Sequence, residues 1–465
     1  MASLQEDVDV TVPGTENNGK LAWLLKLSRA RWTRRIGATF IDQALFAGTN
    51  FLLNILLAIW MTPEEYGAFV LAYAWFLLVL SIYDAVLSEP MGIFGAGKYA
   101  ATFQRYLGLT YFGHIGLGFI AFLVLVVGAL VTYLGGSQIL GEAMFGISIA
   151  APMILMRWLT RQPFYVLSKP HLSALGNFVY LISALVLVFG FHIFNILSPF
   201  SAPLVMGLGG LISSLFLTFV FLHPEFKKAD PAVTAESVIK DHWDYGRWST
   251  GSRFLSWIPD QVYYLVFPLF VDLSASGALS VLLYLIMPVM MTITAMVGLL
   301  IPSFVRIYNG QGIAGVTARV KLVIGLMVIL TGLYGLAIVI LGIPALHWVF
   351  NGKYDASVNI PVLLTLGLIP TLGAINTILD AALRAMGGVK QTFISKILPA
   401  VITLTIGIVL LANLGILGRN LATLLGQISA IGLLWRFYRM RMGEVKSPVE
   451  GSGDSLEASI PATID

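Results

Sequence analysis

Apolar runs of about 20 residues alternate with short polar breaks along most of this chain. The first such unit is a hairpin, in which an apolar run over 36–60 is followed by a polar break at 61–67 and a second apolar run to residue 88. Each run is long enough to cross roughly 30 Å of hydrocarbon as a helix. Pro63 favours an end to the first helix, and Gly67 frees the start of the second. The pattern therefore predicts a membrane hairpin.

Similar runs recur to residue 436. They predict an all-α polytopic membrane protein with twelve transmembrane helices in two pseudo-symmetric six-helix bundles. The expected spans are 36–60, 66–88, 106–134, 143–162, 171–196, 203–222, 250–271, 277–304, 319–343, 359–384, 392–413 and 417–436.

The longest polar segment between spans divides the chain into two halves. The predicted organisation is a cytoplasmic tail with a basic amphipathic segment (1–35), an N-terminal six-helix lobe (36–222), a cytoplasmic linker (223–249), a C-terminal six-helix lobe (250–436) and a disordered cytoplasmic tail (437–465). The basic stretch 20–35 is expected either to lie on the membrane surface or to be a plain charged flank of the first span.

Composition agrees with a membrane protein. Hydrophobic residues make up 57% of the chain and charged residues 11%, whereas soluble domains carry about 25% charge. The absence of cysteine excludes disulfides, thiolate catalysis and cysteine-ligated metals. The six histidines show no metal-ligand spacing, so no metal site is expected.

Positive charge predicts the orientation of the spans. When the polar segments are assigned alternately to two sides, all 28 Lys and Arg residues except Lys353 and Arg419 fall on one side. Since cytoplasmic loops carry the excess of Lys and Arg, both termini are expected in the cytoplasm.

The two halves share a motif. Span one opens with Arg35, Asp42 and Gln43, and span seven opens with Arg253, Asp260 and Gln261 at the same spacing. Six spans separate the two, so the halves run in the same direction, as parallel repeats with a cavity between them would. The alternative is that any two helical hairpins look alike.

Three stretches carry a family resemblance. Residues 57–69, which read LAIWMTPEEYGAF, are similar to the first external turn of the Wzx-type oligosaccharide flippases of the multidrug/oligosaccharidyl-lipid/polysaccharide exporter superfamily. The stretches PDQVYY at 259–264 and LRAMGGVK at 383–390 resemble parts of spans seven and ten in the same family. The resemblance implies two six-helix lobes, alternating access and flipping of an undecaprenyl-pyrophosphate-linked oligosaccharide to the outer leaflet of the bacterial cytoplasmic membrane, for polysaccharide export.

Placing an ionisable side chain inside a membrane span costs free energy. Such residues are therefore candidates for lining a water-filled cavity. We expect the substrate site to be formed by the repeated motif, that is by Arg35, Asp42, Gln43, Arg253, Asp260 and Gln261. The arginines would attract the pyrophosphate, and the aspartates would pair with them in the empty state or bind a coupling proton or sodium ion. The alternative is that both arginines only anchor helix ends at the interface.

No nucleotide cofactor is expected. Residues 92–99 nearly match a phosphate-binding loop, but Tyr99 replaces the required Ser or Thr and no strand precedes the segment. Transport should therefore use an ion gradient, the membrane potential or the substrate's own gradient. The expected partners are a lipid-linked anionic oligosaccharide, membrane lipids and a possible coupling ion, with no nucleic acid and a monomeric chain.

Two other functions stay open. A small-molecule or drug antiporter of the same superfamily would share the fold, although it would want an acidic pocket for cations. A membrane glycosyltransferase or polysaccharide polymerase could use Glu64 and Glu65 as an acidic pair, but the external loops are short for such an enzyme. A transporter, not an enzyme, is the preferred prediction.

Overall fold

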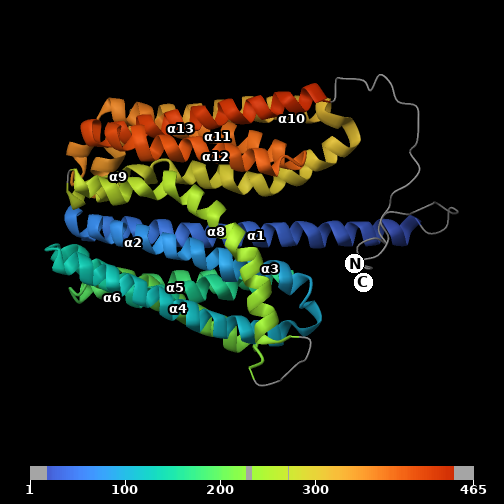
Figure 1. Cartoon of the computed structure of the whole chain (residues 1–465), viewed down its shortest axis with the longest axis horizontal. Helices are drawn as coiled ribbons and strands as arrows, with labels where there is room; N and C mark the ends of the chain where they lie inside the picture. Colours follow the sequence, from blue (N-terminus) through green and yellow to red (C-terminus); the bar gives the residue numbers. More distant parts are fainter. Residues whose placement is uncertain (1–17, 227–232, 271, 445–465) are drawn as a thin grey trace. The chain divides into compact units, whose positions relative to one another are not determined.

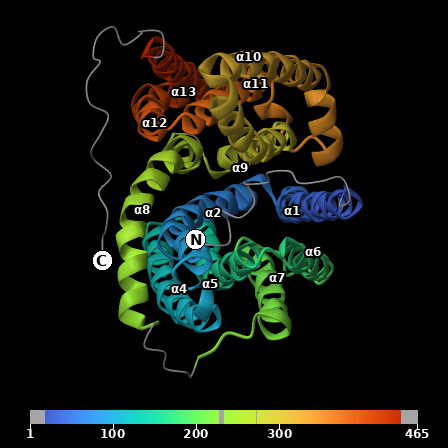
Figure 2. The same ribbon diagram turned by 90° about the vertical axis from the view of Figure 1, so that its right-hand side faces the viewer.

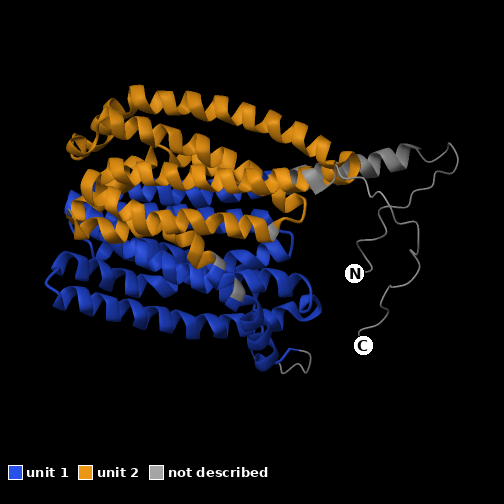
Figure 3. Ribbon diagram, turned by 45° about the horizontal axis from the view of Figure 1, so that its top comes forward, with its two compact units in different colours: residues 1–251 blue, residues 252–465 orange. Residues whose placement is uncertain are grey.

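A computed structural model describes residues 18–226, 233–270 and 272–444 of the protein, and nearly all of them are helical (Figure 1). Two compact units divide the chain, Met1–Gly251 and Ser252–Asp465 (Figure 3). The helices of unit 1 are α1 Asn18–Trp60, α2 Pro63–Tyr83, α3 Glu89–Ala96, α4 Phe103–Leu134, α5 Gln138–Val166, α6 Pro170–Ile193 and α7 Ser201–Leu217. A further helix, α8 Ala235–Val266, begins in unit 1 and ends in unit 2. The helices that follow in unit 2 are α9 Leu273–Tyr284, α10 Met287–Phe350, α11 Ile360–Ala385, α12 Val389–Ile402 and α13 Ile408–Glu444.

The described residues contain nine helices that are long and apolar enough to cross a membrane, or ten if the bent pair Leu273–Tyr284 and Met287–Thr294 is one span. Two features bring this number to the predicted twelve. The apolar stretch Lys390–Met442 is divided by a break at Gly415, where φ is 58°, and α8 has the length of a span but more charge in its first half. The protein is therefore an all-α polytopic membrane protein, as the hydrophobic pattern predicts.

The turn of the first hairpin differs in detail from its prediction. The helix before it ends at Trp60, but α2 begins at Pro63 and Gly67 is buried inside it. A capping box explains this start, because the Thr62 side chain accepts from the Glu65 amide while the Glu65 carboxylate accepts from the Thr62 amide at 2.9 Å. The corresponding helix of unit 2, α9, likewise starts at a cap, in which the Asp272 side chain accepts from Ala275 N at 3.0 Å. Side-chain caps, and not glycine, begin both helices.

Several span ends also move. The second span continues beyond Ser88 through a π-helical turn, Asp84–Ser88, into α3. As a result Glu89 and Gly92 lie inside a helical run, and the segment that resembles a phosphate loop is partly helix. The polar stretch predicted as a linker contains the first four turns of α8.

Small residues allow a close contact between two helices of unit 2. Gly335 on α10 and Gly367 on α11 face each other, and a Cβ on Gly335 would lie 2.5 Å from the Gly367 carbonyl oxygen. Membrane helices approach closely where such residues meet, because the apolar driving force between helices is weak in lipid. In unit 1 the main packing partners are α4 with α5, α5 with α7, and α1 with α6 (Figure 2).

Candidate functional site

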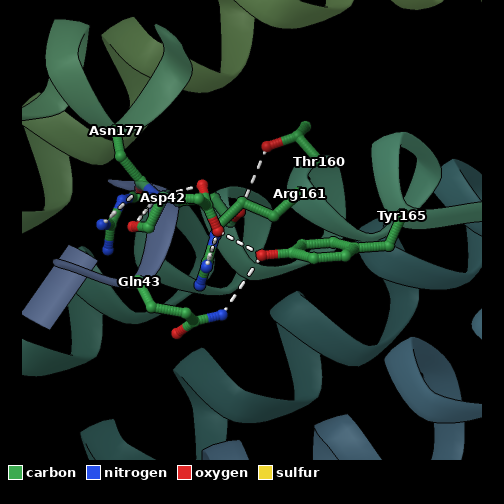
Figure 4. A network of polar contacts seen from close by, with 7 residues as sticks. Asp42, Gln43, Thr160, Arg161, Tyr165 and Asn177 are labelled. Carbon is green, nitrogen blue, oxygen red and sulfur yellow. Dashed lines mark hydrogen bonds and ion pairs between the residues drawn. The ribbon is translucent and has the colours of Figure 1, made fainter. Parts of the chain in front are cut away.

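Unit 1 encloses a charged cluster around Asp42, a fully buried residue of α1. Its carboxylate accepts from Arg161 Nη2 at 2.7 Å and from Asn177 Nδ2 at 2.7 Å, and the Tyr165 hydroxyl donates to the same oxygen as Arg161 (Figure 4). Arg161 and Tyr165 lie on α5 and Asn177 on α6. One carboxylate therefore joins three helices through charge-assisted hydrogen bonds, which are the strong ones.

A second arginine completes the cluster. Arg157 lies one turn before Arg161, is 3% exposed, and donates from Nη2 to Asn177 Oδ1 at 3.0 Å. Its guanidinium carbon is 3.6 Å from the centroid of the Tyr180 ring and 4.6 Å from that of Phe46. Buried arginines can be held by aromatic faces in this way. The cluster thus holds two guanidinium groups against one carboxylate.

Gln43 belongs to the edge of the same cluster. Its side chain is exposed, and its Nε2 donates to the Tyr165 hydroxyl at 3.2 Å. The side chain of Arg35 lies outside the described part of the chain. The structure therefore brings Asp42 and Gln43 together through Tyr165, and the ion-pair partner that it gives Asp42 is Arg161.

Unit 2 has a cavity of about 440 Å³ around Asp260 of α8. Its wall includes Asp380 and Arg384 of α11, which form an ion pair at 2.7 Å, and Lys396 of α12. The Lys396 ammonium lies 3.4 Å from Oγ of Ser256, a lining residue of α8. Charged groups of both signs therefore line a space that is large enough for several water molecules.

An adjoining cavity of about 240 Å³ shares Asp260 and Asn376 with the first. It adds Arg419 of α13, which is 6% exposed and donates from Nη1 to Asn420 Oδ1 at 3.3 Å. Three polar atoms of the residues that line it are buried without a hydrogen-bond partner among the described residues: Arg419 Nε, Asn376 Oδ1 and Gln427 Oε1. Buried polar atoms are rarely left unsatisfied, so this space is suited to a polar occupant.

The other two members of the predicted set lie elsewhere on α8. Arg253 and Gln261 line neither cavity, whereas Asp260 lines both. Asp260 therefore shares its surroundings with Lys396 and Arg419, two cations that the motif did not contain.

In the sequence Arg157 and Arg161 are visible only as part of the Lys and Arg bias that predicts the orientation of the spans. Arg157 lies nine residues, or about 14 Å of helix, before the end of α5 at Val166. Arg157 and Arg161 are also four residues apart, on one helix face. Two arginines on one helix face inside the predicted span 143–162 are the available signal.

Comparison with solved structures relates the fold to one class of transporter. An inward-facing multidrug resistance MATE family transporter of the MOP superfamily matches with a TM-score of 0.71 at 15% identity, over 87% of this chain and 95% of that one. The lipid II flippase MurJ, in an inward closed conformation, matches with a TM-score of 0.67 at 12% identity, over 86% of each chain. A MOP superfamily transporter from Pyrococcus furiosus, for which reverse polarity of the binding pocket suggests a different function, gives 0.63 at 14% identity, over 89% of this chain and 96% of that one.

No protein-family model matches the sequence, and a search of curated protein sequences finds no match. At these identities the likeness concerns the fold. The chain is therefore a multi-pass membrane protein with the fold of MOP superfamily transporters, a fold that drug exporters and a lipid flippase share.

Proposed function

We propose that the protein is a MOP superfamily transporter that flips an undecaprenyl-pyrophosphate-linked oligosaccharide from the inner to the outer leaflet of the bacterial cytoplasmic membrane, by alternating access. One observation carries the proposal, namely an excess of cations over carboxylates in the candidate site of each unit. In unit 1, Arg157 and Arg161 face Asp42 alone. In unit 2, three cations share two adjoining cavities with two carboxylates, and these residues are Arg384, Lys396, Arg419, Asp260 and Asp380.

An excess of buried positive charge favours an anionic substrate. Each charge in a membrane span costs about 2.5–3.5 kcal/mol on insertion scales, and a polyphosphate supplies the missing countercharge. Guanidinium groups match phosphate oxygens in pairs, while lysine acts as a point charge. In the empty state Asp42 holds Arg161 and Asp380 holds Arg384, so the release of these cations to a phosphate costs less than exposing bare charge.

The proposal uses only some of the six site residues that the sequence predicts. Asp42 and Asp260 are retained as the groups that position the cations. The roles of Arg35, Gln43, Arg253 and Gln261 in substrate binding stay predictions. A proton or sodium ion is the expected coupling ion, and a single chain the expected functional unit.

The test compares two lysines on one helix. Lys396→Met removes a cavity cation, and Lys390→Met removes an exposed lysine near the start of α12 that lies outside both cavities. One hydrogen bond to a charged group is worth about 1.5–3 kcal/mol, so Lys396→Met should slow transport by about tenfold or more. Transport is measured as the fraction of a fluorescent lipid-linked oligosaccharide that becomes accessible outside protein-containing vesicles.

Lys390→Met should stay within about twofold of the unchanged protein, as surface charge changes usually do. Equal rates for the two variants would remove the unit 2 cavity from the proposal.

A drug antiporter is the second candidate, because the solved relatives include a multidrug transporter. The same vesicles loaded with a cationic dye separate the two functions. Dye efflux that rises after Lys396→Met, with no flipping in any variant, would favour the antiporter, since removal of a cation makes the cavity more acidic.

A further inference from the structure

A groove in unit 1, separate from the charged cluster, has a volume of about 350 Å³ and lies between α8 and α4. Its α4 wall includes Leu109, Phe112 and Leu117, and its α8 wall includes Ile239 and Trp243. We propose that this groove binds one acyl chain of a bilayer phospholipid, with the headgroup beside the first half of α8. The proposal rests on the membrane fold alone and not on the identity of the transported substrate.

The first half of α8 has the pattern of an interfacial helix. Ala235, Val238, Ile239, His242 and Trp243 recur at the spacing of one helix face, and all five line the groove. Glu236, Lys240, Asp244 and Arg247 occupy the remaining faces. A helix with this division of polar and apolar residues lies in the plane of the membrane surface.

The course of α8 in unit 1 agrees with that pattern. Its first half runs across the ends of α3 and α4 instead of along them (Figures 1 and 2). Hydrogen bonds hold it there: Tyr245 and Ser249 each donate to the Glu89 carboxylate at 2.7 Å, and Lys98 pairs with Asp241 at 2.7 Å. Since α4 crosses the membrane, this part of α8 lies at the surface where α4 enters.

The groove continues from that surface along α4. From Leu109 to Leu117 it extends about 12 Å, close to the depth of about 15 Å that one leaflet contributes to the hydrocarbon core. Phe112 on its rim is 53% exposed, and Ile115 and Phe119 beyond it on α4 are 64% and 59% exposed. The groove is therefore continuous with a surface that faces lipid tails.

The side chains that line the groove favour an apolar ligand. Its two polar side chains, Thr110 and His242, are already bonded: Thr110 Oγ1 donates to Leu107 O at 2.8 Å, and His242 contacts the Tyr106 hydroxyl at 2.6 Å and Val86 O at 3.0 Å. A sugar or a phosphate would therefore find no unbonded hydrogen-bonding group on these two side chains. Trp243 is 59% exposed and lies where the headgroup would be, a position that tryptophan favours at membrane surfaces.

Two glycines on α4 give a matched test. Gly113 lines the groove, and a Cβ there would meet only the flexible Leu87 side chain at 3.2 Å, whereas Gly116 lies outside the groove and a Cβ there would meet nothing. The variants Gly113→Phe and Gly116→Phe are placed in vesicles of phosphatidylethanolamine and phosphatidylglycerol and extracted in mild detergent. Native mass spectrometry then counts the phospholipid that stays bound to the chain.

Gly113→Phe should release the phospholipid, because each methylene that the new ring displaces weakens binding about fourfold. Gly116→Phe should retain it, as the unchanged chain does. Equal retention in all three proteins would overturn the proposal. So would displacement of the phospholipid by an equal amount of undecaprenyl phosphate, which would assign the groove to a substrate tail.

A second measurement does not depend on a bulky variant. The chain has no cysteine, so Ile239→Cys and Lys240→Cys each carry one nitroxide label. The label at 239 should collide mainly with oxygen, which concentrates in lipid, and the label at 240 mainly with a water-soluble nickel complex. Equal access of the nickel complex to both labels would place the groove in water and exclude the acyl chain.

Discussion

The buried ion pair between Asp42 and Arg161 gives the sharpest test of the structure of unit 1. The change is Arg161→Met, which keeps much of the side-chain volume and removes the charge. Asp42 is fully buried, and the Arg161 side chain is 9% exposed. Removing one partner of a buried pair costs about 3–5 kcal/mol, because the other charge is left without compensation.

The expected cost lies at the lower end of that range. After the change, Asp42 still accepts from Asn177 and Tyr165, and Arg157 remains close by through Asn177. We expect a loss of about 3 kcal/mol, and for a unit of about 250 residues this corresponds to a melting temperature lower by roughly 6–12 °C. The measurement is thermal unfolding of the purified protein in detergent.

The double variant decides the reasoning. Asp42→Asn alone leaves two buried guanidinium groups without a carboxylate, so it should cost at least as much as Arg161→Met. Combined with Arg161→Met it should cost clearly less than the sum of the two single changes, by about 1–3 kcal/mol. Additive losses, or a shift below about 2 °C for Arg161→Met, would refute the ion pair as described.

Three further predictions follow from other contacts. Gly335→Val should lower the melting temperature by several degrees because it forces α10 away from α11, whereas Gly332→Val, whose Cβ meets nothing, should not. Lys98→Met should cost under about 1 kcal/mol, because the Lys98 side chain of its pair with Asp241 is 52% exposed. Burial lowers the pKa of His242 below its ordinary value of 6.5; the docked first half of α8 should therefore loosen as the pH falls below 6.5, and a nitroxide at Lys240→Cys should gain mobility there unless His242→Asn is also present.

The sign of the pH effect follows from proton binding. Below pH 6.5 a free imidazole takes up a proton, but His242 in the docked helix resists it, because burial disfavours the charged ring and outweighs the hydrogen bond with Val86 O, which favours it. Undocking therefore gains a proton, and acid favours it until the pH reaches the lowered pKa. The nearby Asp241 carboxylate works in the opposite direction. Its own pKa is lowered: partial burial acts against this, but hydrogen bonds from Lys98 and Tyr99 outweigh it, so the pair persists through this range.

The sequence gives reliable information about the fold because hydrocarbon imposes a strict length on every span. Runs of apolar residues and the bias of Lys and Arg lead to an all-helical membrane protein. Helix starts are less predictable. Thr62 and Glu65 begin α2 through a reciprocal cap, a local device that an interpretation based on Pro63 and Gly67 overlooked.

The candidate site was only partly predictable, since a one-dimensional pattern shows what lies along a helix and not what faces it. The spacing of Arg35 and Asp42 suggested a pair on one helix, yet the carboxylate of Asp42 bonds to α5 and α6. In the sequence Arg161 contributes only to the Lys and Arg bias that predicts membrane orientation. In a membrane protein one residue can serve both purposes: Arg161 lies toward the end of its helix that is predicted to be cytoplasmic, and its side chain is long enough to reach a partner inside the bundle.

Both units place an aspartate near cations, but they use different residues to do so. In each of them an aspartate on the helix that opens the half, Asp42 or Asp260, shares its surroundings with cations from later helices. In unit 1 Asp42 is fully buried and bonded directly to a cation, whereas in unit 2 Asp260 is exposed and lines two cavities. If both sites served only to hold helices together, both should be closed. The difference argues that unit 1 supplies a fixed charge and that unit 2 holds the groups that are free to exchange partners, so Lys396→Met should affect transport more than stability, and Arg161→Met both.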